Sequence, residues 1–216
     1  MLGSSHKAIR LAYYCQLFTR QSKVFFAKGI DREASCGSDE FIRQLHELSR
    51  LLHKIDEATE KQIPFLIVVP NAIVPISKQM ELLEYSDNKG ETDLHDAGFR
   101  SLYLGACTDR LYLAYHVRSA SDFLGTSFDF SRDVLERGRF GLTAEEGIAL
   151  ACYNPPDMFL GFPRNLVGSR YGESNEVPYL FDRMLVDSAG PGLAAWPESK
   201  KTHIASVFPE CAGRLS

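Results

Sequence analysis

The chain has 216 residues, of which 44% are hydrophobic and 24% charged, and its formal net charge is −4. This composition is typical of a soluble globular protein that buries a core without disulfide or metal staples. The negative charge argues against a role in coating nucleic acid, and no apolar run approaches the ~18 residues of a membrane helix. We therefore expect neither nucleic acid nor membrane as a partner.

The first 30 residues contain no acidic side chain but several basic ones, namely Lys7, Arg10, Arg20, Lys23 and Lys28. An acid-poor basic segment is typical of a transit peptide or a surface-binding arm. The segment also contains Tyr13, Tyr14, Phe18, Phe25 and Phe26, which we expect to be buried, and this favours a docked helix instead. The spacing of Ile9, Tyr13 and Leu17, four apart, predicts that helix over residues 6–20.

A second helix is predicted from Ser38, which would cap it, to about Lys61. Its apolar stripe at helical spacing consists of Phe41, Leu45, Leu48, Leu52 and Ile55. Pro64 excludes helix at the residue before it and so ends the element.

Short strands follow. Residues 65–69 (FLIVV) predict a fully buried strand, and residues 84–98 a polar acidic loop. Residues 111–117 predict a strand with Leu113 on one face and Ala114 on the other. Strand-like runs come late in the chain, at 164–168, 177–187, 192–196 and 203–208.

Two more helices are predicted between these strands. Ser131 would cap a short one that Gly138 stops. The run Thr143-Ala-Glu-Glu146 is a capping box, in which the Thr143 hydroxyl and the Glu146 carboxylate each accept from a backbone N–H of a helix start. Gly147 directly after it indicates close packing or a ligand near the backbone.

Helices concentrate early and strands late, without βαβ alternation. This order favours an α+β fold: N-terminal helices followed by a mainly antiparallel or mixed sheet with one or two packed helices. We expect an N-terminal helical segment over residues 1–37 and a single α+β domain over 38–216.

The cysteines are scattered, odd in number and without a CxxC pair: Cys15, Cys36, Cys107, Cys152 and Cys211. This spacing fits neither a disulfide framework nor a zinc site. Free thiols in a reducing cytoplasm are the simplest interpretation, so we expect a cytoplasmic protein without metal or cofactor. Nucleotide-binding and hydrolase signatures such as GxGxxG, GxxxxGK[ST], GxSxG and HExxH are absent from the sequence.

A glycine-framed turn is the candidate binding site. Gly168-Ser-Arg-Tyr-Gly172 follows a short apolar run, and its backbone N–H groups with the Arg170 guanidinium could hold a carboxylate or phosphate. The alternative is that Arg170 is structural and Gly172 only permits a tight turn. We predict Ser169, Arg170, Gly172 and His203 as ligand-binding residues and leave catalytic residues unassigned.

The segments GRFGLTAEEGIAL (138–150), LVGSRYG (166–172) and VPYL (177–180) resemble DUF5701, a bacterial family of domains of unknown function. The resemblance is specific over 138–180 and extends loosely to 214. It implies no activity, cofactor or catalytic residue.

Three functions are compatible with these features. The first is a soluble cytoplasmic domain that binds a small anion. The second is an enzyme of unknown class that uses Arg170 with His203, with which Glu145 and Ser169 could converge. The third is a protein–protein interaction or homo-oligomeric structural protein, in which the basic first helix and the Phe41–Ile55 stripe pack on a partner.

Overall fold

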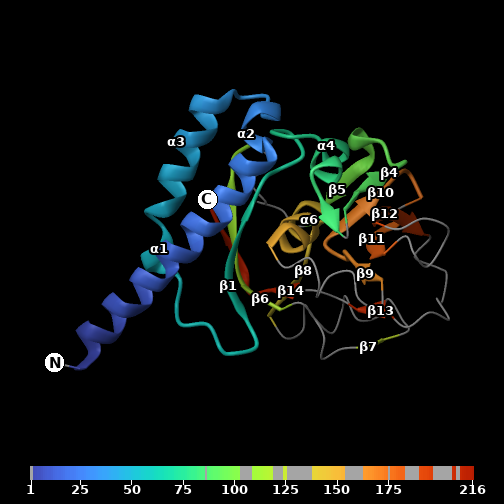
Figure 1. The fold of residues 1–216 in the computed structure, drawn as a ribbon. Coiled ribbons are helices and arrows are strands. Elements are labelled where there is room, and N and C mark those ends of the chain that lie inside the picture. The colour runs from blue at the N-terminus through green and yellow to red at the C-terminus, as the bar shows by residue number, and fades with distance from the viewer. Residues whose placement is uncertain are drawn as a thin grey trace.

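The fold is given by a computed structural model. It describes residues 2–85, 87–102, 109–118, 124–125, 138–153, 163–174, 176–182, 190–196, 206–207 and 210–216. Its elements form four layers, which Figure 1 shows from left to right: a pair of helices, a three-stranded sheet, one helix, and a second sheet.

The first layer consists of α1 (Leu2–Lys28) and α3 (Ser38–Ser49), joined by the short α2 (Ile30–Glu33). Helix α1 is longer than the predicted 6–20. The prediction that Ser38 caps α3 was wrong: its hydroxyl donates to the Asp31 carbonyl at 3.1 Å, and no side chain caps this helix.

Helix α3 is also shorter than the predicted 38–61 and is followed by a 3-10 turn, η1 (Leu52–Lys54). The reason is a change in hydrogen-bond spacing, because the Leu51 and Lys54 N–H groups donate three residues back. The tighter turn still buries Leu52 and Ile55, so the whole apolar stripe is buried although its last part is not α-helical.

The second layer is an antiparallel sheet of order β1-β6-β15, formed by Ile63–Val68, Tyr112–Val117 and Gly213–Leu215. Alternate side chains of its strands enter two separate hydrophobic clusters. Leu113 packs with the first-layer helices, whereas Ala114 packs on the other face. The predicted alternation in this strand is confirmed, and the sheet is buried on both sides.

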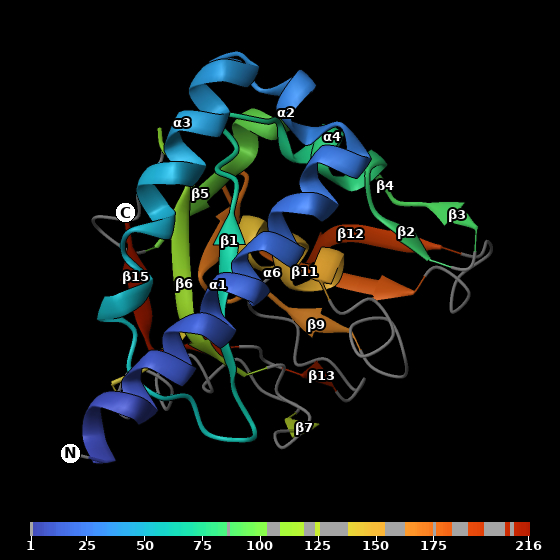
Figure 2. The same ribbon diagram turned by 60° about the vertical axis from the view of Figure 1, so that its left-hand side comes forward.

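The two faces of this sheet are covered by different helices (Figure 2). On one face α1 and α3 contribute Tyr14, Leu17, Phe25 and Phe41. On the other face lies α6 (Ala144–Tyr153), whose residues are almost all buried. The stripe predicted to bind a partner packs inside the chain instead, because Phe41 is fully buried against α1.

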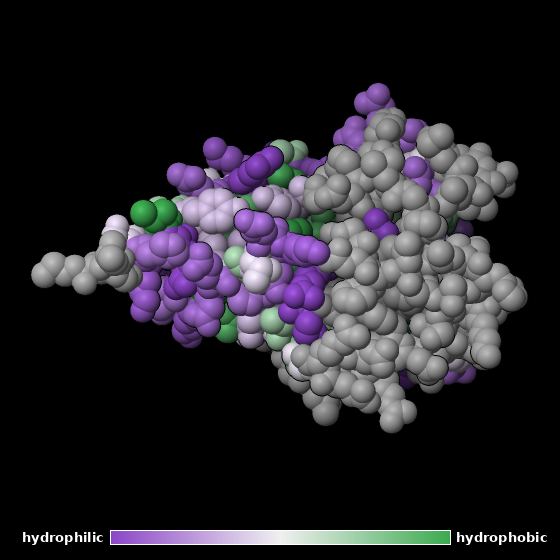
Figure 3. Space-filling model, turned by 90° about the horizontal axis from the view of Figure 1, so that it is seen from below, coloured by the Kyte–Doolittle hydropathy of each residue, from purple (hydrophilic) through white to green (hydrophobic). Residues whose placement is uncertain are grey.

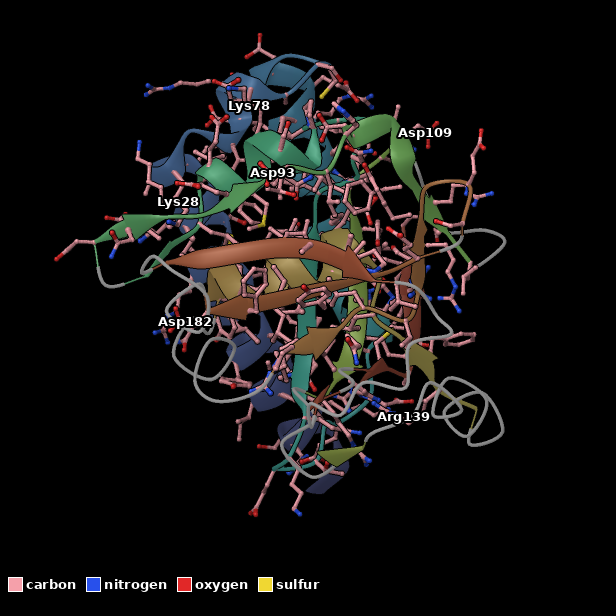
Figure 4. The ribbon with its side chains drawn as sticks, turned by 90° about the vertical axis from the view of Figure 1, so that its right-hand side faces the viewer. Lys28, Lys78, Asp93, Asp109, Arg139 and Asp182 are labelled. Atoms are coloured by element: carbon pink, nitrogen blue, oxygen red, sulfur yellow. The ribbon has the colours of Figure 1, made fainter. Side chains whose placement is uncertain are left out.

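The fourth layer is a mixed sheet of order β4-β12-β11-β9-β13-β7. Its strands, in that order, are Glu91–Thr92, Pro191–Trp196, Val177–Asp182, Arg164–Asn165, Ser206–Val207 and Leu124–Gly125. Seen from this side, β11 and β12 cross in front of α6, and the labelled Asp182 marks the end of β11 (Figure 4). Helix α6 therefore lies between two sheets.

Shorter elements complete the described part of the chain. Three two-stranded ribbons pair β5 (Phe99–Ser101) with β10 (Ser169–Tyr171), β8 (Phe140–Gly141) with β14 (Glu210–Cys211), and β2 (Glu84–Tyr85) with β3 (Asn88–Lys89). Two short helices, α4 (Ile76–Glu81) and η2 (Asp96–Gly98), lie near them.

The segment 84–98 was predicted as a polar loop, but it contains the short strands β2, β3 and β4. That prediction was therefore wrong in detail. Asp87 takes a positive φ of 65° between β2 and β3, which aspartate tolerates better than most residues. Thr92 in β4 then donates to the Leu193 carbonyl at 2.9 Å, which ties the segment to β12.

The α+β class is confirmed: N-terminal helices precede mostly antiparallel and mixed sheets. The short helix predicted between Ser131 and Gly138 lies outside the described residues. Across the described residues no helix combines the length and apolarity that a bilayer crossing needs. The division at residue 37 stays a prediction, although α1 shares a hydrophobic cluster with α3 and β1.

Candidate functional site

The predicted capping box forms at the start of α6. The Thr143 N–H donates to Glu146 Oε2 at 2.8 Å, and the Glu146 N–H donates to Thr143 Oγ1 at 3.3 Å. These two bonds use backbone donors that the first turn of a helix leaves without intrahelical partners. The helix start is therefore fixed by its own local sequence.

Ser169 adds a third bond from a distant part of the chain. Its hydroxyl oxygen accepts from the Ala144 N–H at 2.9 Å, and the residue is only 1% exposed. Ser169 thus ties β10 to the start of α6. This role accounts for a buried serine that the sequence suggested as a ligand contact.

Glu146 is also half of a buried ion pair. Arg214 in β15 donates from Nε to Glu146 Oε1 at 2.5 Å and from Nη2 to Oε2 at 2.8 Å, a two-point contact. The exposed fractions of the two side chains are 12% for Arg214 and 0% for Glu146. Burial lowers the pKa of the guanidinium, but the adjacent carboxylate outweighs this and raises it.

Tyr112 completes this cluster from the central sheet. Its hydroxyl donates to Glu146 Oε1 at 3.2 Å, and the residue is buried. Burial, followed by the negative charges of Glu146 and Glu145, raises the pKa of Tyr112 well above its ordinary value. The phenol therefore stays protonated and acts as a hydrogen-bond donor at neutral pH.

Glu145 is the residue directly before Glu146 in the helix. Part of the residue is exposed, but its carboxyl is buried. This burial, with the Glu146 charge adding to it, raises the pKa of Glu145. Hydrogen bonds from Thr143 and from the Asn71 backbone act in the opposite direction. The raised pKa makes Glu145 a candidate for proton transfer.

The β5–β10 ribbon carries the arginines near this helix start. Antiparallel register places Arg170 directly opposite Arg100, with Ser169 opposite Ser101 and Tyr171 opposite Phe99. Neighbours along a strand point to opposite faces, so Ser169 faces α6 while Arg170 shares the other face with Arg100. Ser169 and Arg170, which were predicted to lie together at the site, therefore point to opposite faces of the strand.

The two guanidinium groups have different surroundings. Arg170 is buried and donates from Nη1 to the carbonyls of Val167 and Ser169, at 3.0 and 2.9 Å. Arg100 is exposed and donates from Nη2 to the Gly172 carbonyl at 2.8 Å. Arg170 thus stabilises its own turn, and Arg100 is the more accessible cation.

Gly172 ends β10 with a φ of 64°, a conformation that glycine adopts without strain. Its N–H donates to the Gly98 carbonyl at 3.1 Å. The glycine therefore permits the turn and supplies the carbonyl that receives Arg100.

Of the four predicted ligand residues, three lie in or beside β10, and His203 lies outside the described residues. Sequence reasoning missed Arg100, Arg214 and Tyr112. Strand register brings Arg100 to Arg170 across 70 positions, and no local pattern in the sequence carries that information. Among the described residues no group of three His, Cys, Asp or Glu side chains is placed to hold a metal ion.

Comparison with known proteins places the chain in a family. The sequence profile of DUF5701, a family of unknown function, matches residues 24–180, and the chain belongs to this family. A search of curated proteins and a search of solved structures gave no match.

Proposed function

We propose that this chain binds a small anionic ligand at the face of the β5–β10 ribbon that carries Arg100 and Arg170. The supporting observation is the direct register of the two arginines on neighbouring strands. Two guanidinium groups on the same face of a ribbon can donate to one bound anion together. The planar guanidinium fork suits carboxylate or phosphate oxygens.

The ligand would meet two unequal partners. Arg100 is exposed and supplies the entry contact, whereas buried Arg170 supplies a fixed positive charge held by the turn carbonyls. Because the whole chain is acidic, with a net charge of −4, such a pair is a local exception to its overall charge. Scattered cysteines support a cytoplasmic setting for this binding.

Thermal unfolding in inorganic phosphate tests the proposal, with chloride at equal ionic strength as reference. A ligand that binds only the folded chain raises its midpoint in proportion to the logarithm of ligand concentration above the Kd. We expect phosphate to raise the midpoint of the wild type and of Arg110→Ala, and not that of Arg100→Ala. Arg110 is the matched control, since it is an exposed arginine paired with Glu47 at 3.1 Å.

Equal responses of Arg100→Ala and Arg110→Ala would overturn the proposal. Arg170→Ala is a poorer test, because the guanidinium supports the carbonyls of its own turn and its removal costs stability by itself. Native mass spectrometry gives a second measurement: mass that co-purifies with the wild type and leaves on denaturation should be missing from Arg100→Ala.

A second candidate function is an enzyme that transfers a proton through Glu145. The observation in its favour is the raised pKa of Glu145, which lies beside the ion pair of Glu146 with Arg214. Titration of the Glu145 carboxyl by carbon NMR tests this candidate. An ordinary glutamate pKa would remove its support, and turnover lost in both Glu145→Gln and His203→Ala would establish it.

A further inference from the structure

The N-terminal part of helix α1 projects from the rest of the molecule. From Phe25 back to Tyr14 one face is buried against α3 and β1. Beyond Tyr14 the helix continues toward the N-terminus without that cover, and Ile9 and Tyr13 are 67% and 54% exposed. Figure 1 shows this end pointing away from the sheets, and Figure 3 shows hydrophobic surface there among hydrophilic side chains.

A hollow of about 390 Å³ lies where α1 separates from the segment 57–64. Ile9, Arg10 and Tyr13 line it from the helix, and Glu57 and Glu60 line it from the segment. The hollow therefore has a helix edge that carries apolar and basic side chains and an acidic edge on the segment.

The charges on the two edges are loosely held. His6 on α1 lies 3.8 Å from Glu57, and the two side chains are 67% and 64% exposed. An exposed pair at this separation contributes about 0–1 kcal/mol, so its members exchange partners at little cost.

This arrangement is complementary to itself. A two-fold axis through the hollow places the helix edge of one copy against the acidic edge of the other, twice. It also covers the Ile9 and Tyr13 side chains of each copy and removes them from water. A partner with charge of one sign would instead repel one of the two edges.

We propose that the projecting end of α1 and the segment 57–64 form the interface of a symmetric homodimer. Each copy inserts its Ile9 and Tyr13 beside the hollow of the other, and Arg10 of each copy faces Glu57 and Glu60 of the other. The interface is separate from the α3 stripe, which is already buried within the chain. It does not depend on anion binding at the β5–β10 ribbon.

Sedimentation equilibrium of the full chain, from about 1 to about 300 µM, tests the dimer by mass action. We expect the wild type to dimerise, and Arg10→Glu and Glu57→Arg each to raise the dissociation constant at least about tenfold, because each reversal acts twice. Mixing the two variants should restore a mixed dimer. In that dimer the introduced glutamate of one chain meets the introduced arginine of the other, and the native pair forms at the second contact. That rescue requires contact between chains.

The matched controls address the exposed apolar side chains. Ile9→Asp should give a monomer, whereas Ile42→Asp, at an isoleucine 48% exposed on α3, should leave the dimer intact. Circular dichroism confirms that both variants are folded. A wild type that stays monomeric over the whole range would overturn the proposal, as would equal dissociation of Ile9→Asp and Ile42→Asp or failure of the mixed variants to associate.

Discussion

The start of α6 and the free end of α1 both gather charged side chains, but they hold them in opposite ways. Glu146 is fully buried in a two-point contact with Arg214, whereas His6 and Glu57 face water at 3.8 Å. A buried charge must be paired to be tolerated, and breaking the pair is costly. An exposed pair contributes little. The start of α6 therefore stabilises the fold, and the N-terminal end of α1 is available to a partner.

Removal of the buried carboxylate should have the largest effect. Glu146→Gln removes the carboxylate that pairs with the buried Arg214 side chain, and we expect a loss of about 3–5 kcal/mol in the free energy of unfolding in urea. The matched control is Glu47→Gln, where an exposed glutamate pairs with Arg43 and Arg110 and the expected loss is about 0–1 kcal/mol. Similar small losses in both variants would mean that the two regions do not differ as described.

A smaller loss is expected from Gly147→Ala. A Cβ on Gly147 would overlap Leu166, with Cδ1 only 2.8 Å away, and overpacking of this kind costs about 1–3 kcal/mol. Alanine's better helix propensity opposes this by up to about 1 kcal/mol. Urea unfolding of Gly147→Ala in the wild-type and Leu166→Ala backgrounds measures the clash. Additive effects in that cycle would refute direct contact.

The same contact explains why a glycine stands at position 147. From the sequence, close packing and an approaching ligand were equal explanations of a glycine inside a helix. The Leu166 side chain occupies the space where a Cβ would project, so packing is sufficient.

Glu145 should make stability depend on pH. The pKa of Glu145 is raised in the folded state. Its contribution to the free energy of unfolding is therefore fully present below the ordinary glutamate pKa, where both the folded and the unfolded chain are protonated. That contribution is lost as pH rises through the folded-state pKa. Glu145→Gln removes that loss. We expect its urea midpoint, relative to wild type, to increase from about pH 4 to about pH 7. A constant difference would show that the carboxyl has an ordinary pKa.

Local patterns predicted the parts of this protein that local physics determines. The capping box at Thr143 forms, and so does the alternation predicted over 111–117. The buried strand predicted over 65–69 forms as Ile63–Val68. Each depends on contacts within a few residues, on a period of two or on a short apolar run. The prediction at Ser38 failed because Gly37 takes the N-cap position and Ser38 is already the first residue of the helix.

The candidate site was predicted only in part, for a related reason. Ser169, Arg170 and Gly172 are near one another because they are near in sequence. The residues that give them their roles come from elsewhere: Arg100 by strand register and Ala144 by its hydrogen bond to Ser169. Neither the register of a short ribbon nor the partner of a buried hydroxyl is encoded in a local pattern.

The smallest expected effect compares two cysteines, one on each of the contrasted helices. Cys15 on α1 is exposed, while Cys152 on α6 is buried between the sheets and burial raises its pKa to about 11. Only the thiolate is alkylated, so both access and ionisation protect Cys152. Iodoacetamide at about pH 8 should label Cys15 in the native protein and Cys152 only after denaturation, as read by peptide mass spectrometry. Equal rates at the two thiols would mean that α6 opens as freely as the end of α1, and the contrast between a closed and an open region would fail.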